Sequence, residues 1–184
     1  RDKNNPSIVM WSLGNEVDEA NGSPRSIETA KRLKAVIKAI DTERYVTMGE
    51  NKFSRASTGD FLKVAEIMDA VGMNYGERNY EAVRRAHPDW LIYGSETSSA
   101  TRTRDSYYNP AQILGHDNRP NRHYEQSDYG NDRVGWGRTA TESWTFDRDH
   151  AGYAGQFIWT GIDYIGEPTP WHNQDNTPVK SSYF

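Results

Sequence analysis

The sequence has 184 residues, enough for one sizeable core, and its net charge of −4 with a pI near 5.7 provides no basic surface, so nucleic acid is not an expected partner. No apolar run approaches the roughly 20 residues of a membrane span, and the absence of cysteine excludes disulfides, thiolate metal sites and cysteine nucleophiles. Aromatic residues make up 12% of the chain. They argue against disorder and suit stacking on sugars, although a place in the core explains any single one more simply.

Strand-like and helix-like segments alternate along the chain. Short apolar runs bounded by turn residues predict buried strands, and apolar residues at helical spacing predict helices between them. The predicted strands are 8–11, followed by a turn that ends on Glu16, then 44–49, 70–75, 90–95 and 155–160. The predicted helices are 24–41, 60–68, 77–86 and 139–153. Ser23 and Pro24 are a typical N-cap and first helical residue, and Pro88 ends the third helix. Because the connections are too long for hairpins, the alternation predicts right-handed parallel βα units.

The number of βα steps fits either an open sheet or part of a (β/α)₈ barrel, since a whole barrel takes about 250 residues. No glycine-rich phosphate loop follows any predicted strand, which disfavours a nucleotide-binding sheet. We therefore expect an α/β fold that forms the C-terminal part of a TIM barrel. Residues 97–138 and 161–184 interrupt the alternation and are predicted to be ordered loops, the second of them over a pocket.

Two carboxylates each follow a predicted buried strand. Glu16 and Glu96 are 80 positions apart with two predicted strands between theirs, so in a barrel they would face each other across the mouth. Glycoside hydrolysis needs such a pair, one carboxylic acid to protonate the leaving oxygen and one carboxylate to attack or to activate water. A solvated loop residue is the alternative interpretation for either glutamate alone, and the matched contexts favour the catalytic one.

Three further residues at strand ends are candidate sugar contacts. Asn15 precedes Glu16 and is suited to bond a sugar hydroxyl, or simply to form the turn. Tyr75 is suited to hold a nucleophile ionised, and Trp159 to form the pocket floor beneath a pyranose ring, although each would look the same as a core residue. The five histidines show no paired ligand spacing, so no metal site built within this segment is expected. No cofactor is predicted, and no Gly-x-Ser-x-Gly motif indicates a serine hydrolase.

Three segments resemble glycoside hydrolase family 2. The segment DKNNPSIVMWSLGNE (2–16) is similar to the acid/base signature of that family, and IYGSET (92–97) to its nucleophile segment. The segment GQFIWTGIDYIGEPTPW (155–171) resembles the last barrel strand and its loop in the β-galactosidase branch. The resemblance covers essentially the whole chain and is closest to large surface-attached bacterial β-galactosidases, which implies an extracellular or cell-surface location.

The resemblance implies a retaining exo-β-galactosidase that acts on galactose-terminated oligosaccharides or glycans. Glu96 would attack the anomeric carbon, and Glu16 would protonate the departing sugar and later deprotonate water. The positions that match substrate contacts of the family are Asn15, Asn51, Tyr75, Trp159, Glu167 and Trp171. Asn51 replaces an acid of the relatives, which puts substrate preference in question, and Asn5 replaces a common histidine, which should affect packing more than chemistry.

The resemblance also implies that the chain corresponds to barrel strands four to eight. Strands one to three, the preceding β-sandwich domains and the last helix would lie outside it, so the remainder of the parent chain would be needed to complete the barrel, and the isolated segment is expected to be inactive. A β-glucuronidase or β-mannosidase of the same family is the first alternative, although no Asn-x-Lys feature follows the seventh barrel strand. A non-catalytic sugar-binding or adhesion fragment is the second, and two mutually repelling carboxylates argue against it.

Overall fold

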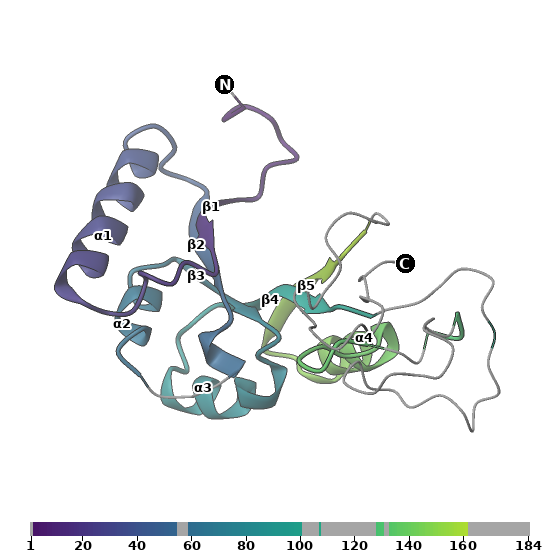
Figure 1. Ribbon diagram of the computed structural model, residues 1–184. Helices are drawn as coiled ribbons and strands as arrows, with labels where there is room; N and C mark the ends of the chain where they lie inside the picture. The colour runs from purple at the N-terminus through teal and green to yellow at the C-terminus, as the bar shows by residue number, and fades with distance from the viewer. Residues whose placement is uncertain (1, 55–58, 101–106, 108–127, 131–132, 162–184) are drawn as a thin grey trace, which may run out of the picture. The chain divides into compact units, whose positions relative to one another are not determined.

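The computed structural model describes residues 2–54, 59–100, 107, 128–130 and 133–161 (Figure 1). Helices and strands alternate as expected: β1 (Met10–Asn15), α1 (Pro24–Lys38), β2 (Tyr45–Glu50), η1 (Lys52–Ser54), α2 (Leu62–Ala65), β3 (Ala70–Asn74), η2 (Glu77–Asn79), α3 (Tyr80–Ala86), β4 (Ile92–Ser98), α4 (Ala140–Asp149) and β5 (Tyr153–Trp159). The five strands form one sheet in the order β1-β2-β3-β4-β5, and each of the first three neighbouring pairs is parallel. The predicted α/β fold, a fragment of a TIM barrel, is confirmed.

The chain divides into two compact units. The first comprises Arg1–Glu96 with Ala151–Gln156, and the second comprises Thr97–His150 with Phe157–Phe184. Both candidate catalytic glutamates belong to the first unit, whereas Trp159 belongs to the second. The long segments predicted to be ordered loops, 97–138 and 161–184, lie largely outside the described residues.

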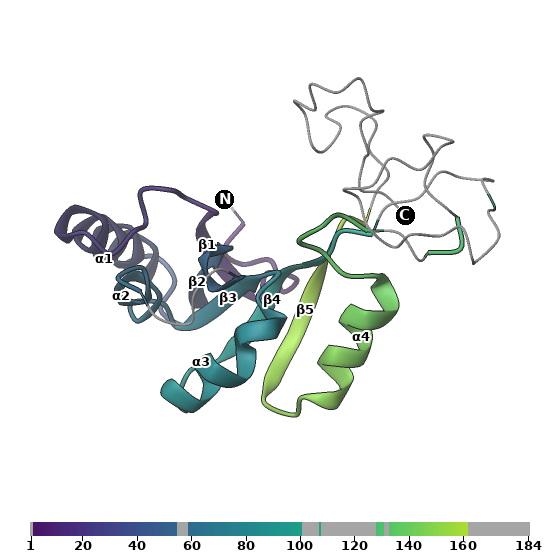
Figure 2. The same ribbon diagram turned by 60° about the horizontal axis from the view of Figure 1, so that its bottom comes forward.

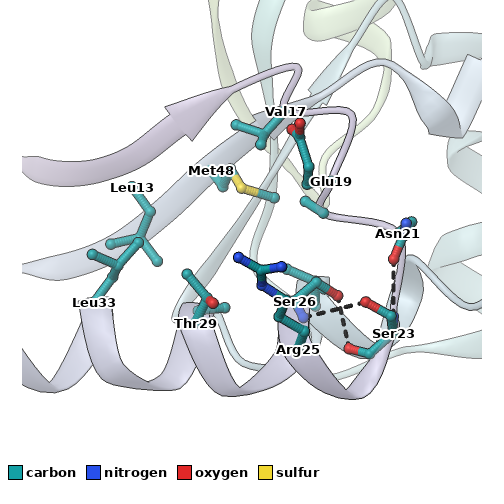
Figure 3. A pocket seen from close by; sticks show the side chains of 13 residues that line it. Leu13, Val17, Glu19, Asn21, Ser23, Arg25, Ser26, Thr29, Leu33 and Met48 are labelled. Carbon is teal, nitrogen blue, oxygen red and sulfur yellow. Dashed lines mark hydrogen bonds between the residues drawn. The ribbon is translucent and has the colours of Figure 1, made fainter.

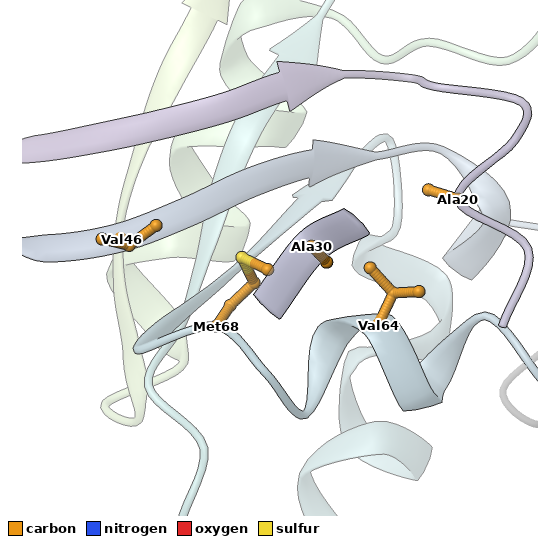
Figure 4. Packing of buried hydrophobic residues seen from close by; sticks show 5 residues of the cluster. All are labelled: Ala20, Ala30, Val46, Val64 and Met68. Carbon is orange, nitrogen blue, oxygen red and sulfur yellow. The ribbon is translucent and has the colours of Figure 1, made fainter. Parts of the chain in front are cut away.

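One hydrophobic cluster of the first unit lies between β1, β2, α1 and α2. In Figures 1 and 2, α1 and α2 lie on the same side of these strands. Figure 4 shows the buried members of this core cluster, with further partly buried apolar side chains packed against it. The cluster consists of Ala20, Ala30, Val46, Val64 and Met68. Because strand side chains alternate between faces, Val46 and Met48 pack toward the helices, and Thr47 and Gly49 belong to the opposite face.

Helix boundaries follow local chemistry. Ser23 caps α1 by accepting a hydrogen bond from the Ser26 N–H at 3.3 Å, and Pro24 occupies the first helical turn as predicted. The predicted helix 60–68 is wrong in length, since only Leu62–Ala65 is α-helical. After this helix the backbone N–H groups of Ile67 and Met68 donate to the carbonyls three residues earlier, as in a 3₁₀ turn. The apolar spacing therefore continues beyond the end of the α-helix.

Hydrogen bonds and an ion pair of Arg44 hold the N-terminal ends of β1 and β2, opposite the ends that carry the glutamates. Arg44 donates to the carbonyls of Lys3, Asn5 and Ile8, which holds the segment before β1 against the start of β2. Asp41 accepts from the indole N–H of Trp11 at 2.9 Å and pairs with Arg44 at 2.6 Å. Among the described residues, no helix has the length and apolar character needed to cross a membrane.

Candidate active site

A break in strand register precedes each candidate catalytic glutamate. Between β1 and β2 the pairing shifts between Ser12 and Asn15, and between β3 and β4 it passes from Met73↔Gly94 to Asn74↔Glu96. Because side chains alternate along a strand, each extra residue turns the following side chain to the other face. The bulges direct the side chains of Asn15 and Glu96 toward the same face of the sheet, where both contact Asn74.

Asn74 lies between the two glutamates. Its side-chain Nδ2 donates to Glu16 Oε1 at 2.8 Å and lies 3.5 Å from Glu96 Oε2. These two carboxylate oxygens are therefore at most 6.3 Å apart, the sum of the two distances. The structure thus brings Glu16 and Glu96 together from strands that are separated in the sheet by β2 and β3.

Glu96 receives two further polar contacts. The hydroxyl of Tyr75 donates to Glu96 Oε1 at 2.6 Å, and Asn15 Nδ2 lies 3.5 Å from Oε2. Burial raises the pKa of Glu96, and the nearby charge of Glu16 raises it further. The hydrogen bonds from Tyr75 and, to a smaller extent, Asn15 lower the pKa. The net pKa of Glu96 lies above the ordinary value for glutamate. The site therefore combines partial burial with donors that stabilise the ionised form.

The backbone at the site adopts an uncommon conformation. Glu16 has φ 51° and Tyr75 has φ 52°, both in the left-handed region that non-glycine residues seldom occupy. Two hydrogen bonds hold these positions: the Glu16 N–H donates to the Gly49 carbonyl at 2.9 Å, and the Tyr75 N–H donates to the Glu96 carbonyl at 2.9 Å. The neighbouring strands thus fix the turn that aims each side chain.

Of the remaining predicted contacts, Asn51 and Trp159 are at or beside the ends of strands. Asn51 directly follows β2 and is partly buried; Lys52 beside it pairs with buried Glu50 at 2.7 Å and donates to the Val17 carbonyl at 3.1 Å. Trp159 ends β5, accepts a backbone hydrogen bond from Ser99 at 3.0 Å, and precedes a cis peptide bond to Thr160. Glu167 and Trp171 lie outside the described residues.

Sequence reasoning did not single out Asn74 or Ser95. Asn74 is fully buried, and Ser95 Oγ donates to its Oδ1 at 2.5 Å. An amide at the end of an otherwise apolar strand, 70–74, was the signal that could have found Asn74, because a buried polar side chain requires partners.

A cavity of about 630 Å³ lies on the other face, between α1 and the connection from β1 (Figure 3). It is lined by apolar residues such as Leu13, Leu33 and Met48 and by polar residues of the helix start such as Ser23 and Arg25. Neither Glu16 nor Glu96 lines it. This cavity is therefore separate from the carboxylate pair.

Two carboxylates that lie together at the strand ends of a parallel βα sheet are an arrangement typical of TIM-barrel glycosidases. Comparison with known proteins agrees: the family profile described as "Glycosyl hydrolases family 2, TIM barrel domain" matches residues 1–176. The chain therefore belongs to glycosyl hydrolase family 2.

The relatives are much longer than this chain. The β-galactosidase BoGH2A of Bacteroides ovatus is 32% identical over all of the chain and 25% of its own length, so the chain spans about a quarter of that relative. A Formosa agariphila protein with the provisional name β-glucuronidase is 27% identical over 91% of the chain and 16% of its own length. A solved β-glycosidase structure from Bacteroides vulgatus is 25% identical with a TM-score of 0.66, covering 91% of this chain and 23% of that one.

Proposed function

We propose that the protein carrying this chain is a retaining exo-β-galactosidase, with Glu96 as nucleophile and Glu16 as acid/base. The observation that carries this proposal is the Tyr75–Glu96 hydrogen bond beside a second carboxylate. A nucleophilic carboxylate must be ionised, and the Tyr75 hydroxyl and the Asn15 amide both donate toward Glu96. Glu16 accepts from the neutral amide of Asn74, an environment suited to a group that gains and loses a proton in each cycle.

The proposed reaction has two displacements. A Glu96 carboxylate oxygen attacks the anomeric carbon and forms an ester while Glu16 gives its proton to the departing glycosidic oxygen. Water then attacks the same carbon, Glu16 takes its proton, and the bond to Glu96 breaks, so both carboxyls return to their starting states. The bound of 6.3 Å between Glu16 Oε1 and Glu96 Oε2 supports this assignment, because it places both carboxyls within reach of one glycosidic bond.

Galactose is the proposed sugar because BoGH2A, which matches the whole chain, is a β-galactosidase. In this proposal Asn15 and Tyr75 contact the bound sugar, as do Asn51, Trp159, Glu167 and Trp171. The Formosa agariphila relative makes β-glucuronidase the second candidate. A β-mannosidase and a non-catalytic sugar-binding fragment remain the outcomes that the experiment must separate.

The test is hydrolysis of chromogenic β-galactoside, β-glucuronide and β-mannoside by the full-length protein. We expect turnover of the galactoside, with β-galactose as the first anomer seen by NMR, and loss of more than about 10³-fold in Glu96→Gln. Glu66→Gln, an exposed glutamate at the end of α2, is the matched control and should retain wild-type activity. The 184-residue segment alone is expected to show no hydrolysis of any of the three substrates.

Every alternative result of this experiment would refute a specific part of the proposal. Turnover of only the glucuronide or the mannoside would refute the sugar assignment, and α-galactose as the first product would refute the retaining mechanism. An active Glu96→Gln enzyme would refute the nucleophile. Sugar binding without hydrolysis of any substrate would refute the enzyme.

A further inference from the structure

We propose that Asn74 and Ser95 form a positioning pair that orients the acid/base carboxyl of Glu16. This assignment rests on the proposed function, since it concerns how that reaction is supported. Neither residue needs to touch the sugar for it to act.

The hydrogen-bond pattern of Asn74 is complete. Its two amide hydrogens serve Glu16 Oε1 at 2.8 Å and Asn15 Oδ1 at 2.9 Å, and its Oδ1 accepts from Ser95 Oγ at 2.5 Å. An amide has two donors and one carbonyl, so each strong partner accounts for one of them. The Ser95 hydroxyl fixes which end of the amide faces the carboxyl, because a donor on Oδ1 leaves Nδ2 directed toward Glu16.

Two glycines on the neighbouring strands leave room for this pair. A Cβ at Gly72 would lie 2.6 Å from Ser95 Oγ and 2.8 Å from the Met48 carbonyl oxygen. A Cβ at Gly49 would lie 2.6 Å from Asn15 Oδ1 and 3.0 Å from Asn74 Oδ1. Any side chain at either position would displace the network, so β2 and β3 are shaped around it.

The chemistry of an amide suits the proposed role of Glu16. A neutral donor bonds the carboxyl whether it is protonated or ionised, and both states occur in one catalytic cycle. By occupying Oε1, Asn74 leaves Oε2 as the oxygen that carries the proton to the leaving group. The contact from Asn74 to Glu96 is longer, 3.5 Å, so the loss of Asn74 should affect proton transfer more than nucleophilic attack.

The test compares two β-galactosides in the full-length protein. Methyl β-galactoside needs its leaving oxygen protonated, whereas 2,4-dinitrophenyl β-galactoside leaves without help. In Asn74→Ala we expect kcat/KM for the methyl substrate to fall about 100-fold and for the dinitrophenyl substrate by no more than about threefold. Ser95→Ala, a smaller change that keeps the amide, should show the same selectivity at about tenfold, and it keeps the test decisive if Asn74→Ala fails to fold.

Thr47→Val is the matched control. Thr47 is buried on the same face as Gly49, and its hydroxyl bonds the Ala70 carbonyl at 2.7 Å and lies 3.1 Å from the Tyr93 hydroxyl rather than near the carboxylates. Its loss should leave the ratio of the two substrates unchanged. Equal losses on both substrates in the Asn74 and Ser95 variants would overturn the positioning role while leaving the proposed function intact. A wild-type protein that hydrolyses no β-galactoside would overturn the proposed function itself, and this assignment with it.

Discussion

Replacing Tyr75 with phenylalanine should move the acid limb of the pH profile to higher pH. Tyr75 is buried, with 8% exposure, so the phenyl ring can keep its place while the hydroxyl that bonds Glu96 at 2.6 Å is lost. Burial already raises the pKa of Glu96, and the Tyr75 hydrogen bond is the first contact that opposes it. Without that bond the pKa of Glu96 rises further.

The size of the shift follows from the strength of the bond. A hydrogen bond to a charged group contributes about 1.5–3 kcal/mol, and one pKa unit corresponds to about 1.36 kcal/mol. Glu96 is only partly buried, so solvent screening favours the lower end, a shift of about 1 pH unit. Because the nucleophile must be ionised, activity exists above the pKa of Glu96 and disappears below it, so the variant loses activity first at acid pH.

The assay is kcat/KM against pH for 2,4-dinitrophenyl β-galactoside, whose first step needs no proton donor. Its acid limb reports the group that must be ionised in the free enzyme. Tyr80→Phe is the control, because Tyr80 is a buried tyrosine on α3 that packs edge-to-face against Tyr153. An acid limb that stays in place in Tyr75→Phe, or that moves equally in Tyr80→Phe, would refute the reasoning.

Two further predictions concern stability. Val46→Ala removes two methyl groups from a fully buried position. It should lower the free energy of unfolding, measured by urea titration, by about 2 kcal/mol. A loss below about 0.5 kcal/mol would contradict this, because it would mean that neighbouring side chains fill the cavity. Burial raises the pKa of Asp69, but hydrogen bonds from Lys34, the Val46 N–H and Lys38 outweigh it and lower the net pKa. A depressed pKa stabilises the fold above the unfolded value, near 3.8, and that stability disappears as the pH falls through the folded value. Asp69→Asn should therefore lower the urea midpoint at pH 7 and flatten its decline below about pH 4, and an unchanged pH dependence would contradict this linkage.

The alternation of strands and helices was predictable because apolar period and turn residues are local signals. The predicted strands brought Glu16 and Glu96 to one edge of the sheet, where Glu16 directly follows β1 and Glu96 lies within β4. The two bulges were not predictable, since they depend on register with strands distant in sequence. In the structure β4 extends to Ser98, beyond the predicted end at 95.

The role of Asn74 was hidden for a related reason. Its environment is built by Asn15 and Glu16 from β1 and its end, and by Ser95 from β4, so no window around position 74 contains the partners that satisfy it. The two glutamates were recognisable from the sequence by their residue type and their position after apolar runs. Asn74, the amide between them, had no feature that distinguished it from an ordinary residue at a strand end. Supporting residues of this kind become visible only when the strands are paired.

The left-handed backbone at Glu16 and Tyr75 has a consequence for the evolution of this protein. A non-glycine residue in that region costs about 1–2 kcal/mol, which glycine would largely avoid and asparagine would reduce. Selection for thermal stability alone would therefore favour glycine or asparagine at position 16. At position 75 the loss of the buried tyrosine ring would cost about 3–5 kcal/mol, more than the backbone strain, so Tyr75 should persist. A stabilised variant library grown without a demand for turnover should lose Glu16 while it keeps Tyr75.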